Sequence, residues 1–267
     1  MMDVILYQSE GSYHYTGNVK MFNLKVFNRS RAISMETVNG KRKQLSFLLL
    51  IPCIFLCFCT SRNTLENNAG LEPIQRLLEG NKRYIESNPA HPHQSIGRMK
   101  EISEAQHPFA VVVSCSDSRV PPEIIFDQGL GDLFVIRTAG NVIGEYELAS
   151  VEYAIMKLQC KIIVIVGHEK CGAIQSFIEQ PIDSLSGHLN SLINFLRSEP
   201  NSLNILKYSK NKSYHTIIHN IIYGIKLLKD ESKIIRNKIE SRELEIYGTI
   251  YHMDTGKIQI IEEVVKK

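Results

Sequence analysis

The segment FAVVVSCSDSRVPPEIIF, residues 109–126, joins a strand that looks buried to a loop rich in functional groups. Its first part, Phe109 to Ser114, is a continuous apolar and β-branched run, which indicates a strand covered on both faces, as in a parallel sheet. The chain then presents Cys115, Asp117 and Arg119 at alternate positions, before two prolines turn it away. A strand end needs a turn, but it does not need a thiol, a carboxylate and a guanidinium. This loop is therefore the first candidate for a functional site.

Three more segments have the same continuous apolar character. They are DLFVIR at residues 132–137, KIIVIVG at 161–167 and LEIYGTIYHMD at 244–254, the last of which turns into KIQIIEEVV. Helical spacing of apolar residues, or a helical composition, is found at Glu72–Ser87, Ile102–Gln106, Glu145–Leu158, Gly172–Phe177, His188–Arg197 and Thr216–Ile239. The alternation predicts an α/β fold: a mostly parallel central sheet of about four strands, plus a C-terminal antiparallel strand, flanked by helices.

Length and composition are those of an ordinary globular protein with one good-sized domain. The chain has 267 residues, of which 43% are hydrophobic and 22% charged. Residues 1–59 hold seven of the 31 Lys and Arg and three of the 28 Asp and Glu, which leaves 24 basic against 25 acidic residues in the rest. The body is thus near neutral, which does not suggest a nucleic-acid partner. Three of the six cysteines lie within residues 53–59, and the other three do not suggest a disulfide framework.

The N-terminal part has the layout of a secretory signal. A basic triplet at residues 41–43 precedes about fifteen mostly apolar residues, a run shorter than the roughly 20 that a membrane span needs. A short membrane anchor or a buried helix is the alternative interpretation. Met35 is a plausible true start, because the segment would then begin an ordinary signal peptide of about residues 35–59.

These observations divide the chain into a leader at residues 1–59, a polar linker at 60–70 and one domain at 71–267. Cys59 ends the apolar run in a context that resembles a bacterial lipoprotein signal, so a membrane tether through a lipidated Cys59 is one expectation. The predicted location is the cell envelope or periplasm, and the cytoplasm is the alternative.

Two of the predicted strands end in residues that can bind a metal. One ends at Cys115, and another ends in GHEKCGA, which presents His168 and Cys171 three residues apart. In an open α/β sheet the carboxyl ends of the strands meet at one edge, where ligands bind. Two thiolates and an imidazole are donors that zinc prefers. A single cysteine is often only a small buried hydrophobe, so the prediction of a zinc site depends on the combination of all three.

Asp117 and Arg119 complete the pattern around Cys115. A carboxylate beside a bound metal can act as a fourth ligand, accept a hydrogen bond from metal-bound water, or help accept its proton. Arg119 can hold Asp117 in a bidentate pair and favour its ionised form. Asp117 therefore has two possible partners, zinc or Arg119, and a loop-capping aspartate with a surface ion pair is the simplest alternative.

The motifs CSDSRVPPE, GDLFVIRTAGN and GHEKCGA together resemble those of the β-class carbonic anhydrases of bacterial type, and the resemblance covers about residues 71–261. It implies the β-carbonic anhydrase fold and a lyase, carbonate dehydratase, that hydrates carbon dioxide reversibly to bicarbonate and a proton by zinc-hydroxide attack. It implies one zinc per chain, bound by Cys115, His168 and Cys171, with Asp117 and Arg119 as the catalytic pair.

The same resemblance implies a substrate pocket. It assigns substrate binding to Gln106, Phe134, Tyr153 and Gly172, partly from across a dimer interface, and so implies a homodimer or a higher homo-oligomer. Aromatic walls with few donors suit a small apolar guest such as carbon dioxide. Core packing is the alternative interpretation of Phe134 and Tyr153.

Other readings of the sequence stay open. Some members of the family carry an inhibitory bicarbonate site with a tryptophan where this chain has Val112, and the chain contains no tryptophan. Cys160 has no role in the resemblance and is predicted to be a core thiol. The alternatives for function are a carbonyl sulfide or carbon disulfide hydrolase on the same scaffold, and a non-catalytic envelope protein stabilised by zinc. A redox thiol is a weaker alternative, because no C-x-x-C motif is present.

Overall fold

The computed structural model describes residues 7–9, 12–14, 71–179 and 187–264. The chain divides into two compact units, Met1–Pro52 and Cys53–Lys267. In the first unit two short strands, β1 (Tyr7–Ser9) and β2 (Ser12–His14), pair as an antiparallel hairpin. The predicted apolar signal segment, Cys59 and the linker lie outside the described residues.

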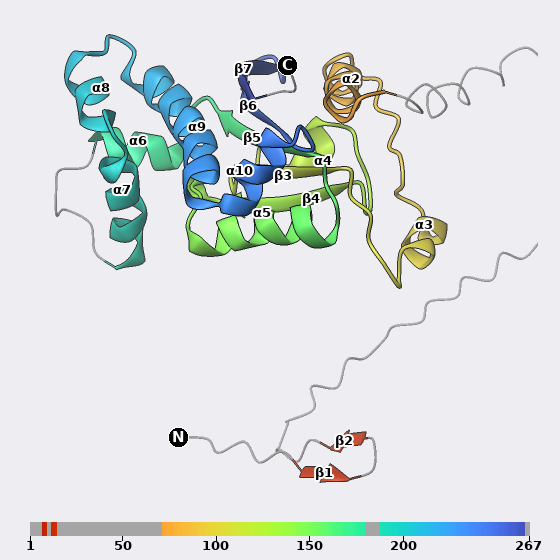
Figure 1. The fold of residues 1–267 in the computed structure, drawn as a ribbon. Coiled ribbons are helices and arrows are strands. Elements are labelled where there is room, and N and C mark those ends of the chain that lie inside the picture. Colours follow the sequence, from red (N-terminus) through yellow and green to blue (C-terminus); the bar gives the residue numbers. More distant parts are fainter. Residues whose placement is uncertain (1–6, 10–11, 15–70, 180–186, 265–267) are drawn as a thin grey trace, which may run out of the picture. The chain divides into compact units, whose positions relative to one another are not determined.

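A five-stranded sheet forms the centre of the second unit, in the order β4-β3-β5-β6-β7 (Figure 1). Its strands are β3 (Ala110–Cys115), β4 (Leu133–Thr138), β5 (Ile162–His168), β6 (Glu245–Tyr251) and β7 (Ile258–Val264). The first four are mutually parallel, and β7 runs antiparallel to β6. This confirms the predicted fold class. Every residue of β3 and β5 is buried, which explains why these strands are continuous apolar runs rather than alternating ones.

Helices connect and cover the strands of this unit (Figure 1). They are α2 (Pro73–Ile85), α3 (Ile96–Glu101), α4 (Pro122–Ile125), the short 3₁₀ helix η1 (Ala139–Asn141), α5 (Glu145–Lys157), α6 (Gly172–Glu179), α7 (His188–Ser198), α8 (Ser202–Tyr208), α9 (Lys212–Glu231) and α10 (Lys233–Glu240). Helix α5 packs on β4, α9 lies on β5 and β6, and α10 contacts both α9 and α5.

Two of the predicted helices are wrong in their bounds. The helix expected at Ile102–Gln106 lies earlier, as α3, because the side chain of Ser95 accepts a hydrogen bond from the Arg98 N–H and so caps a helix that ends at Glu101. The single helix expected at Thr216–Ile239 is two helices. Ser232 has extended backbone angles, and its hydroxyl caps α10 by accepting from the Ile235 N–H.

Two glycines let α9 approach the sheet closely. A Cβ atom at Gly167 would lie 2.6 Å from the Ile221 side chain, and one at Gly248 would lie 2.7 Å from the same side chain. Only glycine therefore allows Ile221 to sit against both β5 and β6 at this distance. The close approach also brings Asn220 of α9 to the loop after β4, where its amide donates to the Gly140 carbonyl at 2.7 Å.

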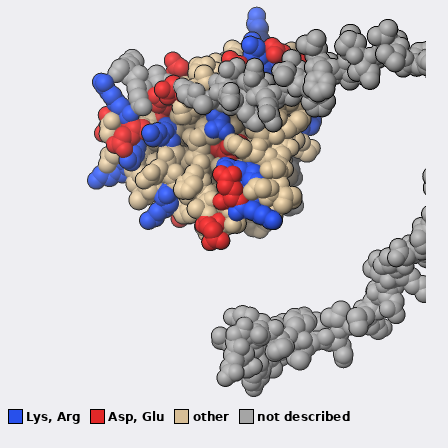
Figure 2. All heavy atoms as spheres, turned by 90° about the vertical axis from the view of Figure 1, so that its right-hand side faces the viewer, with Lys and Arg blue, Asp and Glu red and all other residues tan. Residues whose placement is uncertain are grey.

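The surface of this unit carries charges of both signs. On the face drawn in Figure 2, basic and acidic side chains of the described residues are interspersed among uncharged ones. Within the described ranges, none of the helices combines the length and hydropathy that a bilayer crossing requires.

Candidate metal centre

The structure brings the three predicted zinc ligands together at the carboxyl edge of the sheet. β3 and β5 are neighbours in parallel register, with Ser114 opposite Val166, so both strands deliver their last residues to the same place. One potential ligand atom from each of Cys115, His168 and Cys171 lies within 4.8 Å of the other two. All three residues are buried, with exposed fractions of 4%, 1% and 3%.

The two thiols share a hydrogen bond, with their sulfur atoms 3.9 Å apart. The bond from Cys171, with further hydrogen bonds from the backbone of Asp117 and Gly140, outweighs burial and lowers the pKa of Cys115 to about 4. The Gly140 N–H lies 3.2 Å from the Cys115 sulfur. The hydrogen bond to Cys115 and burial raise the pKa of Cys171 above its ordinary value. The lowered pKa of Cys115 favours its thiolate form at neutral pH, and a bound cation would stabilise a second thiolate at Cys171.

His168 presents its Nε2 atom to the same space. Its Nδ1 atom lies 2.8 Å from the Glu169 carbonyl oxygen, and because a carbonyl only accepts, Nδ1 carries the proton. Nε2 is therefore a lone-pair donor, and it is buried without a hydrogen-bond partner among the described residues. An orphaned imidazole nitrogen between two thiols is the arrangement expected of a zinc ligand, so the residues fit this metal.

Asp117 is bound to Arg119 by both of its oxygens. Arg119 Nε lies 2.9 Å from Oδ1 and Nη2 lies 2.7 Å from Oδ2, and the Arg119 N–H donates to Oδ1 at 2.9 Å. These bonds hold the pKa of the Asp117 carboxyl well below its usual range. Asp117 Oδ2 is 4.0 Å from His168 Nε2, so the ionised carboxylate faces the three ligands while it pairs with Arg119. In this structure Arg119 is thus the partner of Asp117, one of the two that the sequence left open.

Arg119 and Arg137 fix the positions of the loops that form the site. Arg119 Nη2 also donates to the Lys170 carbonyl at 3.1 Å, which joins the loop after β3 to the turn after β5. Arg137 of β4 donates to the carbonyls of Cys115 at 3.0 Å and of Asp117 at 2.6 Å. Sequence reasoning assigned no role to Arg137. The only available signal was its position in the GDLFVIRTAGN motif.

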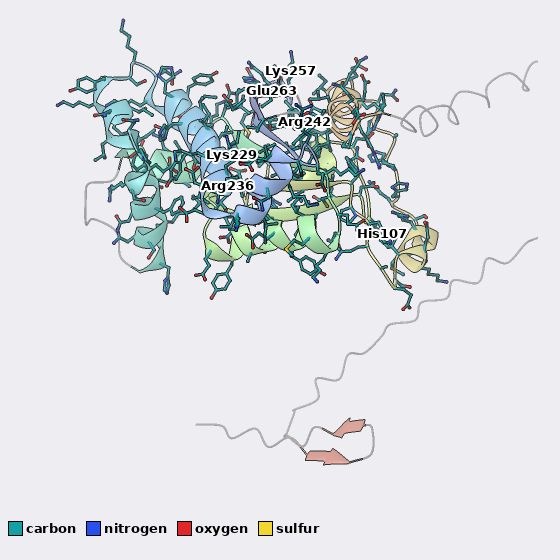
Figure 3. All side chains as sticks on the ribbon, viewed as in Figure 1. His107, Lys229, Arg236, Arg242, Lys257 and Glu263 are labelled. Atoms are coloured by element: carbon teal, nitrogen blue, oxygen red, sulfur yellow. The ribbon has the colours of Figure 1, made fainter. Side chains whose placement is uncertain are left out.

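Three of the predicted pocket residues lie at the other end of the sheet. Phe134 is opposite Val111 in the pairing of β4 with β3, which places it about 13 Å along the strand from Cys115. Tyr153 of α5 packs on Phe134, with ring centroids 6.1 Å apart, and is 48% exposed. Gln106 precedes β3, and its neighbour His107 lies on the side of the unit near α3 (Figure 3). The structure therefore groups Phe134 with Tyr153, but not with the metal ligands of the same chain.

Gly172, the fourth predicted pocket residue, does lie beside the metal ligands. It directly follows Cys171 and is the first residue of α6. A Cβ atom at this position would meet no atom of the described residues within 4 Å, so open space borders it. The position is compatible with a backbone N–H that faces a small substrate.

Known proteins with the same pattern identify the family. The family model for carbonic anhydrases matches residues 110–258, more than half of the chain. A carbonic anhydrase from Mycolicibacterium smegmatis is 36% identical over 186 residues, which cover 69% of this chain and 89% of the relative. The solved structure of the β-carbonic anhydrase CcaA superposes with a TM-score of 0.57 at 28% identity, over 73% of this chain and 92% of that one. The chain belongs to the β-class carbonic anhydrases.

Two more members show the breadth of the match. Carbonic anhydrase 2 of Mycobacterium tuberculosis is 34% identical to this β-class chain over 190 residues, or 70% of this chain and 91% of the relative. A structure among those of two tetrameric β-carbonic anhydrases from Sordaria macrospora gives a TM-score of 0.57 at 25% identity, over 70% of this chain and 96% of that one.

Proposed function

We propose that this β-class chain is a zinc enzyme that interconverts carbon dioxide and bicarbonate. The observation that carries the proposal is the group of three buried donors, Cys115, His168 and Cys171, next to a carboxylate that Arg119 holds ionised. The family supports the reaction, and the donor set supports the metal. Two thiolates and a neutral imidazole would offset the charge of Zn²⁺ and, as three protein ligands, would leave one position for water. When bound, zinc lowers the pKa of a coordinated water to about 7, so that a nucleophile exists at neutral pH.

Asp117 positions the reacting water. As an ionised carboxylate it can only accept hydrogen bonds, and both of its oxygens are fixed by Arg119. A water between Asp117 and the three donors would give its hydrogen to the carboxylate and turn its lone pair toward the carbon of carbon dioxide. Arg137 donates to the Asp117 carbonyl and so restrains the backbone that carries this carboxylate. Preorganisation of this kind lowers the barrier without a cost at the moment of reaction.

The substrate pocket needs a second copy of the chain. Phe134 and Tyr153 lie too far along the sheet to face the metal ligands of their own chain, and Tyr153 is half exposed. β4 is an edge strand, so a second chain can approach it directly. A homodimer in which Gln106, Phe134 and Tyr153 of each chain complete the site of the other would reconcile these positions with the predicted pocket. The tetrameric relatives support a homo-oligomer of this chain.

The direct test is carbon dioxide hydration, measured by stopped flow against pH on purified protein with its zinc content quantified. We expect catalysis to rise with pH as the nucleophile forms, in proportion to the zinc content. Zinc-loaded protein with rates no higher than the uncatalysed reaction would refute the proposal. In the same experiment, gel filtration with light scattering would report whether the active species contains two chains or a multiple of two.

A further inference from the structure

Glu169, in the turn between two of the zinc ligands, is bound to three consecutive residues at the end of β6. Its N–H donates to the Tyr251 carbonyl at 3.1 Å. Its carboxylate accepts from the Met253 N–H at 3.1 Å and lies 3.1 Å from the Nδ1 atom of His252. The Glu169 and His252 side chains are 32% and 23% exposed, so this contact lies at the rim of the unit. The backbone and the carboxylate of one residue thus hold the turn to the β6–β7 hairpin.

The same residue orients His168. The carbonyl of Glu169 accepts the Nδ1 proton of His168, and this bond fixes which ring nitrogen faces the metal. A metal-binding histidine is usually oriented by a side-chain carboxylate or by a backbone carbonyl. Here a backbone carbonyl does so, and the side chain of the same residue anchors the peptide that carries it.

The turn is also held from its other side. Lys170 has a left-handed backbone conformation, with φ of 54°, and its carbonyl accepts from Arg119. On the hairpin side, the Nε2 atom of His252 lies 3.0 Å from the side-chain oxygen of Gln259 in β7. Glu169 therefore provides the anchor to the hairpin, opposite the anchor that Arg119 provides to the loop after β3.

We propose that Glu169 is a positioning residue for the zinc-binding His168, acting through its carboxylate bonds to Met253 and His252. The inference rests on the proposed function, because it assumes that the three donors bind zinc. Without these bonds the Glu169 peptide can rotate, the His168 ring loses its fixed orientation, and the metal is bound less firmly. The competing explanation is that the contact only stabilises the fold.

The test compares Glu169→Ala with Glu263→Ala. Glu263, labelled in Figure 3, is an exposed glutamate on β7 whose side chain forms no hydrogen bond or ion pair with other described residues. The first readout is the rate at which zinc passes to an excess of chelator, followed with a zinc indicator. We expect Glu169→Ala to release zinc about tenfold faster than wild type, and Glu263→Ala to match wild type. Glu169→Gln keeps an oxygen for the Met253 N–H, so its rate should fall between the two.

The second readout is the visible spectrum of Co²⁺-substituted protein, which reports ligand geometry directly. We expect the bands to shift in Glu169→Ala and, less strongly, in His252→Ala, which removes one of the two carboxylate bonds. A fold that is destabilised equally with and without metal, with unchanged zinc release and an unchanged cobalt spectrum, would overturn the inference. His252→Ala and Glu169→Gln keep the test decisive even if Glu169→Ala fails to fold.

Measuring carbon dioxide hydration alongside zinc release distinguishes a failure of this inference from a failure of the proposed function. Wild-type protein that binds zinc without hydrating carbon dioxide, while Glu169→Ala releases zinc faster, would refute the function and leave the positioning role intact. Wild-type protein that binds neither Zn²⁺ nor Co²⁺ would overturn both.

Discussion

Buried cysteines at the two ends of the central sheet have thiol pKa values that are shifted in opposite directions. At the carboxyl end, hydrogen bonds from Cys171 and from backbone N–H groups lower the pKa of the buried Cys115 thiol to about 4. At the amino end, the thiol of Cys160 donates to the Pro108 carbonyl at 3.3 Å, and burial raises its pKa to about 11. Burial alone thus makes a thiol inert, and only the donors gathered at the strand ends make one a metal ligand.

The two ends of the sheet also differ in whether one chain alone provides the residues of the proposed site. The carboxyl end gathers Cys115, Asp117 and His168 from neighbouring strands, and Arg119 ties their loops together. The amino end carries the aromatic pair of Phe134 and Tyr153 beside an edge strand, away from Cys115, His168 and Cys171. The candidate metal ligands are therefore brought together by the fold of one chain, whereas the proposed pocket would need the association of two.

The largest expected effect is that of Cys171→Ser, which removes a ligand from the carboxyl end. A hydroxyl is a poor zinc donor compared with a thiolate, so we expect little or no zinc in the purified protein and no catalysis above background. Atomic absorption measures the metal, and Cys160→Ala is the matched control because it removes a cysteine from the other end. Full zinc content in Cys171→Ser would contradict the assignment of this ligand.

Asp117→Asn should reduce hydration by about 100-fold or more while zinc stays bound, because it removes the charge that accepts the hydrogen bond of the reacting water. Stopped-flow rates and zinc content are measured on the same sample. Ser118→Ala is the control in the same loop, because Ser118 is exposed and its side chain forms no hydrogen bond among the described residues. Near wild-type turnover in Asp117→Asn would remove Asp117 from the mechanism.

A mixture of two impaired variants can show whether residues from the two ends of the sheet meet in one site between chains. Gln106→Ala should cost about tenfold in activity, the effect of one lost hydrogen bond to the substrate. If Gln106 acts in the site of the partner, a mixed dimer with Asp117→Asn contains one intact site. Co-refolding of equal amounts should then give about a quarter of the wild-type activity by random pairing. Activity no higher than the mean of the two parents would show that each chain uses its own Gln106.

The site at the carboxyl end of the sheet could be predicted from the sequence because the residues that mark it directly follow the apolar runs that mark the strands. Continuous apolar runs marked the strands, and polar residues directly after them marked the site, so Cys115, His168 and Cys171 could be grouped from their places at the ends of predicted parallel strands, together with the family resemblance. The role of Arg137 could not be found in this way, because it depends on the register that places β4 beside β3. The helix expected at Ile102–Gln106 was wrong because Ser95 caps the helix several residues earlier.

The amino end was less predictable for a different reason. Gln106, Phe134 and Tyr153 were expected in the pocket because the resemblance implied it, and nothing in their own spacing relates them to Cys115. Their position at the opposite end of the strands follows from the direction of β3 and β4, and a pocket role for them requires a second chain. A single sequence does not contain that geometry, so this part remains a prediction.

The smallest effect is expected for Cys160→Ala, which should leave hydration unchanged and cost about 1 kcal/mol of stability at pH 7. The pH dependence of the stability difference between wild type and Cys160→Ala is the sharper test of the contrast between Cys160 and Cys115. The folded pKa of about 11 lies above the ordinary value of 9.0, so folded protein keeps the Cys160 proton that unfolded protein loses. Wild type should therefore lose roughly 2 kcal/mol relative to Cys160→Ala as the pH rises from about 9 to about 11, and the difference between the two should shrink or reverse. Urea denaturation of both proteins across this range measures it, and a constant difference would show that Cys160 is not held as a buried thiol.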